Sequence, residues 1–100
     1  MARSPKFKHY RFNVTQPGVQ PAILKALVLM ALKETELIYG RAKVKLDVTY
    51  ELSDTKPICI IEANTECGEH VAKLISGFLI KQVGEQNFRV MRLMNRPKYI

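Results

Sequence analysis

The chain has 100 residues, of which 47% are apolar, and it contains only five glycines and five prolines. This length is enough for one hydrophobic core but too short for two, and the composition excludes a long low-complexity segment. The formal net charge is +7, from 16 basic and nine acidic residues, which directs attention to anionic partners.

Neither a membrane span nor a secretion signal is expected. The longest strongly apolar stretch, AILKALVLMAL, is interrupted by Lys25 and is much shorter than the roughly 20 residues that a bilayer crossing needs. The segment MARSPKFKHY lacks the apolar core of a signal peptide. Two cysteines, Cys59 and Cys67, fit neither a disulfide framework nor a paired zinc motif, so we expect a reducing compartment and no secretion.

The first two predicted elements are a strand and a helix. Residues 9–15, HYRFNVT, place Tyr10, Phe12 and Val14 on one face, which is the alternation of a half-buried strand. A turn follows, and Pro21 suits the first turn of a helix that Gly40 would end. Apolar residues recur at helical spacing between them: Leu24, Leu27, Val28, Ala31 and Ile38.

Two strands are predicted next, joined as a hairpin. Residues 41–52, RAKVKLDVTYEL, alternate apolar and polar positions throughout, which predicts a strand with one wet face at a sheet edge. After the polar connection 53–57, residues 58–63, ICIIEA, are apolar on both faces and predict a central strand.

A second helix and a last strand complete the pattern. The helix is expected to begin near Glu66, with Asn64 or Thr65 as its cap, and to end at Gly84. Its apolar stripe is Val71, Leu74, Ile75 and Phe78. The segment NFRVMRLM, from residue 87, again alternates like a strand.

The order β-α-β-β-α-β predicts an α+β fold, the ferredoxin-like sandwich, in which two helices cover one face of a four-stranded antiparallel sheet. We expect a single domain over residues 1–100, with a basic arm at about 1–8 and a short basic tail at about 95–100. In this topology the strand order is 4-1-3-2, so the first and last strands are neighbours.

The excess positive charge is concentrated at the two ends of the chain. Residues 1–11 and 87–100 contain eight cations and no acid, whereas the residues between them are close to neutral. Pairing of the first and last strands would unite these cations in one surface suited to phosphates. The candidate RNA-binding residues are Arg3, Lys6, Lys8, Arg11, Arg89, Arg92, Arg96 and Lys98. The alternative is a generally basic, solvated surface.

The uncovered sheet face is also expected to be partly apolar. Either Ile58 and Ile60 or Cys59, Ile61 and Ala63 must face away from the helices, and Met91 and Leu93 accompany Arg89. A partner chain usually covers such a face, and we take Ile61, Met91 and Leu93 as the candidate partner interface. Alternatively, flanking segments of the same chain fold back over it.

Catalytic constellations are scarce. His9 and His70 lie two elements apart, and no glycine-rich phosphate loop or metal-ligand cluster is present in the sequence. Cys59 is expected to be a buried structural thiol. Cys67, near a helix start, could have a lowered pKa, but nothing completes a redox motif. The third strand has no aromatic residues for stacking bases, so contacts to folded RNA through its shape and phosphates are favoured.

Four segments resemble the small protein subunits of eukaryotic and archaeal ribonuclease P and ribonuclease MRP: the opening KFKHYRFNV, the helix ending in IYG, the strand KLDVTYE and the closing NFRVMRL. The resemblance covers nearly the whole chain and lies in the order and spacing of these segments. We expect no counterpart of the longer C-terminal extension that some members have.

The resemblance implies a non-catalytic RNA-binding and assembly subunit of a ribonucleoprotein that processes precursor tRNA or other precursor RNA. Catalysis would belong to the particle's RNA with its metal ions, and no cofactor would be bound by the protein. The implied partners are a structured RNA, a related small subunit as a heterodimer, and a TIM-barrel-like subunit. The location would be the nucleus or nucleolus in a eukaryote and the cytoplasm in an archaeon.

Two other functions stay open at this point. Small basic proteins of the same topology occur in ribosomes, and the same scaffold also hosts small enzymes with a site on the open sheet face.

Overall fold

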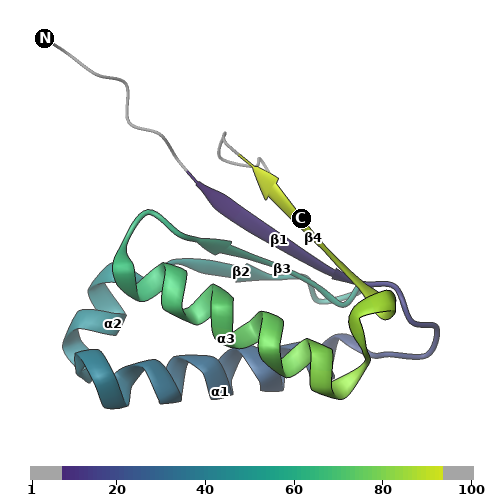
Figure 1. The fold of residues 1–100 in the computed structure, drawn as a ribbon, viewed down its shortest axis with the longest axis horizontal. Helices are drawn as coiled ribbons and strands as arrows, with labels where there is room; N and C mark the ends of the chain where they lie inside the picture. The colour runs from purple at the N-terminus through teal and green to yellow at the C-terminus, as the bar shows by residue number, and fades with distance from the viewer. Residues whose placement is uncertain (1–7, 94–100) are drawn as a thin grey trace, which may run out of the picture.

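A computed structural model describes residues 8–93 of the chain. These residues form a four-stranded antiparallel sheet and three helices (Figure 1). The strands are β1 (His9–Val14), β2 (Tyr50–Leu52), β3 (Ile58–Glu62) and β4 (Phe88–Leu93). The helices are α1 (Pro21–Tyr39), α2 (Arg41–Asp47) and α3 (Glu66–Gln82), and a short 3-10 turn at Glu85–Asn87 leads into β4.

The strand order is β2-β3-β1-β4, which is the predicted strand order 4-1-3-2 counted from the other edge of the sheet. Strand β1 pairs with both β3 and β4, so the segments that lie furthest apart in the described sequence are neighbours. Strand β2 forms the opposite edge and joins β3 in the predicted hairpin. The two long helices lie side by side on one face of the sheet (Figure 1).

The hydrophobic core lies between this sheet and the helices. Phe12 of β1 and Ile61 of β3 are fully buried against apolar residues of α1 and α3. The remaining buried core residues include Val14, Leu24, Leu27, Val28, Ala31, Cys59, Val71, Ala72, Ile75 and Leu79. The even-numbered residues of β1 and the odd-numbered residues of β3 therefore face the helices.

The ends of both long helices are where the sequence predicts them. Pro21 occupies the first turn of α1, and Gly40 follows the helix with φ 90°, a backbone region that favours glycine. The side chain of Thr65 caps α3 by accepting a hydrogen bond from the Gly68 N–H at 3.0 Å. Ile38 is the exception in the predicted stripe of α1, because it is exposed while Thr35 is buried.

The prediction of one long strand over residues 41–52 is wrong. Residues 41–47 form helix α2, and only Tyr50–Leu52 belong to the sheet. Arginine, alanine, lysine and leucine favour helices intrinsically, and a seven-residue alternation is too short to override this preference. In the helix only Val44 is buried, whereas Leu46 is exposed, so the alternating apolar residues do not share a buried face.

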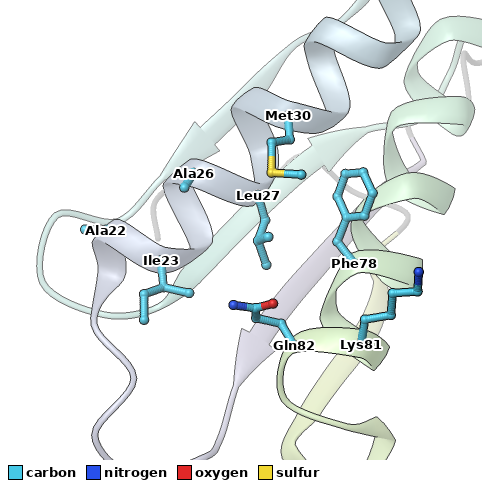
Figure 2. Close-up of a pocket in the computed structure, with 8 residues that line it drawn as sticks. All are labelled: Ala22, Ile23, Ala26, Leu27, Met30, Phe78, Lys81 and Gln82. Carbon is cyan, nitrogen blue, oxygen red and sulfur yellow. The ribbon is translucent and has the colours of Figure 1, made fainter.

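Helix α1 is apolar on its outer side as well as toward the core. Ile23, Leu29, Met30 and Leu37 are exposed large hydrophobic residues of this helix. Between α1 and α3 the surface is hollowed, with Met30 and Phe78 facing the hollow from the two helices (Figure 2). The described structure thus has an apolar surface on the side that is remote from the open face of the sheet.

Candidate nucleic-acid interface

Strands β1 and β4 bring basic residues from both ends of the described chain together. In their register Arg11 lies opposite Met91, and Asn13 lies opposite Arg89. Because directly opposed residues share a face, Arg11 and Arg89 both lie on the face that the long helices leave open. As diagonal neighbours, such residues are about 7 to 8 Å apart, and their Cβ atoms are somewhat closer. The predicted placement of these two arginines on one open side is confirmed.

The two arginines differ in exposure. Arg89 is exposed, whereas Arg11 is half-buried and its Nε atom has no hydrogen-bond partner within residues 8–93. Neither arginine forms an ion pair with any described residue. The charge of the exposed Arg89 is therefore available to an anion, whereas the unpartnered Nε atom of Arg11 is buried and is not accessible to a phosphate oxygen in this structure.

Arg92 lies on the other face of β4. It stands opposite Tyr10, whose side chain packs against the core, so Arg92 belongs to the helix side of the sheet. Arg92 is nevertheless exposed because β4 is an edge strand. The cations of β4 consequently surround one sheet edge and do not form a flat patch on a single face.

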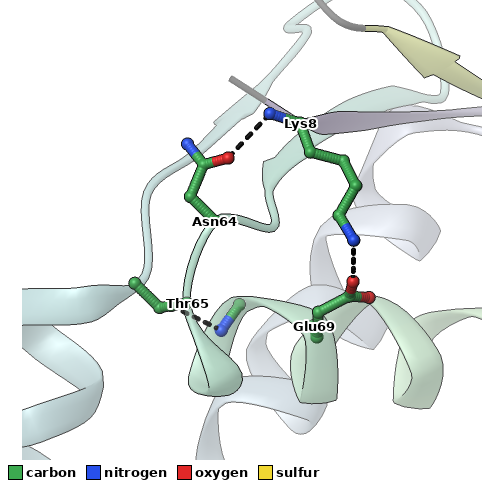
Figure 3. Close-up of polar contacts among 5 residues, drawn as sticks. Lys8, Asn64, Thr65 and Glu69 are labelled. Carbon is green, nitrogen blue, oxygen red and sulfur yellow. Dashed lines mark hydrogen bonds and ion pairs between the residues drawn. The ribbon is translucent and has the colours of Figure 1, made fainter. Parts of the chain in front are cut away.

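Lys8 is already engaged by α3. Its ammonium group donates to the Glu69 carboxylate, and its backbone N–H donates to Asn64 Oδ1 at 2.7 Å (Figure 3). The hydrogen bond to Glu69 raises the pKa of Lys8. The assignment of Lys8 as a free phosphate ligand is therefore corrected: in this structure it holds the start of β1 against the start of α3.

The other predicted phosphate ligands lie outside the described residues. These are Arg3 and Lys6 of the arm, and Arg96 and Lys98 of the tail. Of the eight candidates, the structure thus brings Arg11, Arg89 and Arg92 together around β1 and β4, and it gives Lys8 an internal partner.

The predicted partner interface needs one correction. Ile61 is 0% exposed and belongs to the core between sheet and helices, so it cannot contact another chain. Met91, by contrast, is 55% exposed on the open face, where Leu93 also lies, half-buried. The sequence could not choose between the two faces of β3, because ICIIEA is apolar at both parities.

The apolar part of the open face is smaller than expected. Ile58 and Ile60 point to this face, yet both are buried. Arg11 and Glu51 lie opposite Ile60 on the two adjoining strands, where their aliphatic stems can cover it. The exposed apolar surface of the open face is therefore concentrated at β4.

The described residues contain no group suited to metal binding by three or more histidine, cysteine or carboxylate side chains. His9 is buried beside Glu62, with 3.8 Å between Nε2 and Oε2, while His70 packs edge-on against Tyr39. The two histidines therefore have different neighbours among the described residues.

Both thiols are buried. Burial raises the pKa of Cys59 to about 12 and also raises the pKa of Cys67. A thiolate of lowered pKa at the start of α3 is thus contradicted, and Cys59 is the buried thiol that we predicted.

Within residues 8–93 no helix is both long enough and apolar enough to cross a bilayer.

A scan against protein-family models, a search of curated proteins and a search of solved structures each found no match to this chain.

The sequence reasoning missed the outer apolar surface of α1. The signal was present, because Ile23, Leu29, Met30 and Leu37 fall outside the predicted buried stripe of that helix. The predicted stripe accounts only for the side of α1 that packs on the core.

Proposed function

We propose that the chain is a non-catalytic RNA-binding and assembly subunit of a ribonucleoprotein of the ribonuclease P or ribonuclease MRP type, which processes precursor tRNA or other precursor RNA. The observation that carries this proposal is the pairing of β1 with β4, which gathers Arg11, Arg89 and Arg92 around one sheet edge. We further propose that the fold is ferredoxin-like, with α2 as an additional helix after α1.

The arrangement favours phosphate contacts over base stacking. Phosphate recognition needs unpaired cations, and the three arginines form no ion pair with described residues. Sheet surfaces that bind single-stranded RNA present aromatic rings for stacking. In residues 8–93 the open face has no tyrosine or phenylalanine, because Tyr10, Phe12, Tyr50 and Phe88 belong to the helix side.

In this proposal the particle's RNA, with its metal ions, performs catalysis, and the protein supplies charge and contact surface. Met91 and Leu93 at β4 remain the proposed contacts for a related small subunit on the open side, and a TIM-barrel-like subunit is the second proposed protein partner. The particle would work in the nucleus or nucleolus of a eukaryote, or in the cytoplasm of an archaeon.

The phosphate assignment is tested by RNA binding with charge-matched variants. The double variant Arg89→Gln/Arg92→Gln and the control Lys25→Gln/Lys56→Gln each lose two charges, and the control residues are exposed on α1 and in the β2–β3 connection. Fluorescence anisotropy with a precursor tRNA and with a ribonuclease P RNA is measured at low and moderate salt. We expect the arginine variant to bind RNA at least about tenfold more weakly than the unsubstituted chain, while the control changes little. The slope of log affinity against log salt concentration should become shallower by about two in the arginine variant.

Two results would count against the proposal: RNA affinity that does not fall between low and moderate salt, or equal losses in the two double variants. The assembly role is tested by affinity purification of the tagged chain from its source cells. A bound structured RNA together with a TIM-barrel-like protein is expected. A solitary RNA-free protein would contradict the assembly role, and migration with ribosomal subunits in a sucrose gradient would favour a ribosomal protein.

A further inference from the structure

The outer surface of helix α1 carries large apolar side chains that are exposed to solvent. Met30 is 50% exposed and Leu37 is 86% exposed, and Ile23 and Leu29 are exposed beside them. Within its 19 residues α1 has four charged side chains, Lys25, Lys33, Glu34 and Glu36. A helix that is apolar around most of its circumference is typical of one that is buried on both sides. The core covers only one side of α1 in this structure.

Two adjoining hollows follow this exposed side. The first, of about 560 Å³, lies between α1 and α3 and is lined by Ile23, Met30 and Phe78 among others (Figure 2). The second, of about 470 Å³, follows α1 from Ala26 to Leu37. Both are lined by Ala26 and Met30, so they adjoin at these residues, and we call the two hollows together the α1 groove.

One exposed glycine of α3 lines neither hollow but lies close in sequence to Phe78 and Lys81, which line the first hollow. Gly77 lies inside α3, one residue before Phe78, and is exposed. A Cβ atom at this position would have no heavy atom within 4 Å, so nothing within the described chain requires glycine there. Since glycine in a helix costs about 0.5 to 1 kcal/mol relative to alanine, its presence suits the close approach of a partner helix.

The charges at the groove indicate the chemistry of the partner. Lys81 lines the first hollow and Lys33 lines the second, and neither forms an ion pair with a described residue. Glu34 is the one acid that lines either hollow. A second copy of the chain would bring the same excess of lysine to the contact. A partner with acidic residues beside an apolar stripe would neutralise it.

We propose that the α1 groove binds an amphipathic helix of another protein, whose apolar stripe packs on Met30 and Phe78 and whose acidic residues pair with Lys33 and Lys81. In helix-in-groove recognition the bound helix presents apolar anchors at positions i, i+3, i+4 and i+7, and Ala26, Met30 and Leu37, which are four and seven residues apart, repeat along α1 with the same helical period. This surface lies on the layer opposite to the open face of the sheet. The proposal therefore stands independently of RNA binding.

The test uses two designed helical peptides of about 20 residues that share one leucine stripe and differ in the flanking residues. One peptide has glutamate at the flanking positions, and the other has lysine there. Binding to the full chain is measured by fluorescence anisotropy. We expect the glutamate peptide to bind at least tenfold more tightly than the lysine peptide.

Matched variants locate the binding surface. Met30→Glu adds an acid inside the groove, and Ile80→Glu adds the same acid at a position that is 45% exposed on α3 but lines neither hollow. We expect Met30→Glu to weaken binding of the glutamate peptide at least tenfold and Ile80→Glu to change it less than twofold. RNA affinity, measured in parallel, should be the same in both variants.

Several outcomes would overturn the proposal. The first is equal binding of the two peptides, and the second is an equal loss of peptide affinity in the Met30→Glu and Ile80→Glu variants. A concentration-dependent dimer that Met30→Glu abolishes would assign the groove to a second copy of the chain. Binding to phosphatidylserine vesicles that Met30→Glu abolishes would assign the groove to a membrane surface. Loss of RNA binding in the arginine variants without any change in peptide binding leaves this proposal intact.

Discussion

The inner and outer sides of helix α3 differ sharply at two glycines that the sequence alone does not distinguish. On the inner side, a Cβ atom at Gly68 would lie 2.2 Å from the backbone oxygen of Glu62. On the outer side, a Cβ atom at Gly77 would meet no heavy atom within 4 Å. The first glycine allows the close approach of α3 to β3, so it is required by the fold. The second glycine is not required by packing within the described chain.

The substitutions Gly68→Ala and Gly77→Ala test this contrast most strongly. The Gly68 variant must push α3 away from β3, because a backbone oxygen cannot rotate aside, and we expect a loss of about 4 kcal/mol in the free energy of unfolding. The Gly77 variant should gain about 0.5 to 1 kcal/mol, as alanine does in an exposed helix interior. Urea denaturation of both variants provides the measurement. A stable Gly68 variant would show that the close approach is not needed.

A second contrast between a buried and an exposed position is found at Ile61 and Met91, both of which the sequence predicts at a partner interface. Ile61→Ala removes a fully buried side chain from the core and should cost about 3 kcal/mol of unfolding free energy. Met91→Ala truncates an exposed side chain of the edge strand β4, and the change should stay within about 0.5 kcal/mol. Equal effects in thermal or urea denaturation would mean that β3 presents its other face to the helices.

The buried thiol of Cys59 makes the free energy of unfolding depend on pH. Its pKa is raised to about 12 by burial, above the value of 9.0 for an ordinary thiol, so the folded state retains its proton when the unfolded state has lost it. Stability should therefore fall as pH rises above 9, by about 1.4 kcal/mol between pH 8 and 10 from this group.

The variant Cys59→Ala isolates this contribution. It loses packing at every pH, but its free energy of unfolding should decline less steeply between pH 8 and 10 than that of the unsubstituted chain. The two lysines with a raised pKa, Lys8 and Lys43, titrate above this range and affect both proteins equally. Parallel pH profiles of the two proteins would mean that the Cys59 thiol ionises as readily in the folded state as in the unfolded state.

Long periodic patterns predicted most of the fold. Residues of β1, α1, β3, α3 and β4 carry alternation or helical spacing together with the turn and cap residues that end each element, and the strand order then follows from the topology. Residues 41–47 were predicted wrongly because their alternation and their helix propensity conflict. Contact with α1 and α3, which buries Val44, is invisible in the local sequence.

The candidate site was predictable only where it depends on strand pairing. Arg11 alternates with the core residue Phe12, and Arg89 lies between Phe88 and Val90, which face the helix side, so the shared open face of the two arginines follows from sequence parity. The ion pair between Lys8 and Glu69 could not be predicted from strand pairing. Glu69 is 61 residues away from Lys8, and the two meet only through the packing of α3 on the sheet. The α1 groove was missed although its apolar residues fall outside the predicted stripe, because the sequence does not show how much of the circumference of α1 the core covers.

The cap of α3 provides the smallest test of the contrast between the inner and outer sides. The Thr65 hydroxyl accepts from the Gly68 N–H and donates to the Asp47 carbonyl at 2.8 Å, so one side chain ties the start of α3 to the end of α2. Thr65→Ala should lower the free energy of unfolding by about 1 kcal/mol, and Thr65→Ser, which keeps the hydroxyl, should restore most of it. Since neither contact reaches the outer surface of α1, peptide binding at the α1 groove should be unchanged in both variants. A parallel loss of stability and peptide affinity would show that the groove depends on how α2 and α3 are joined.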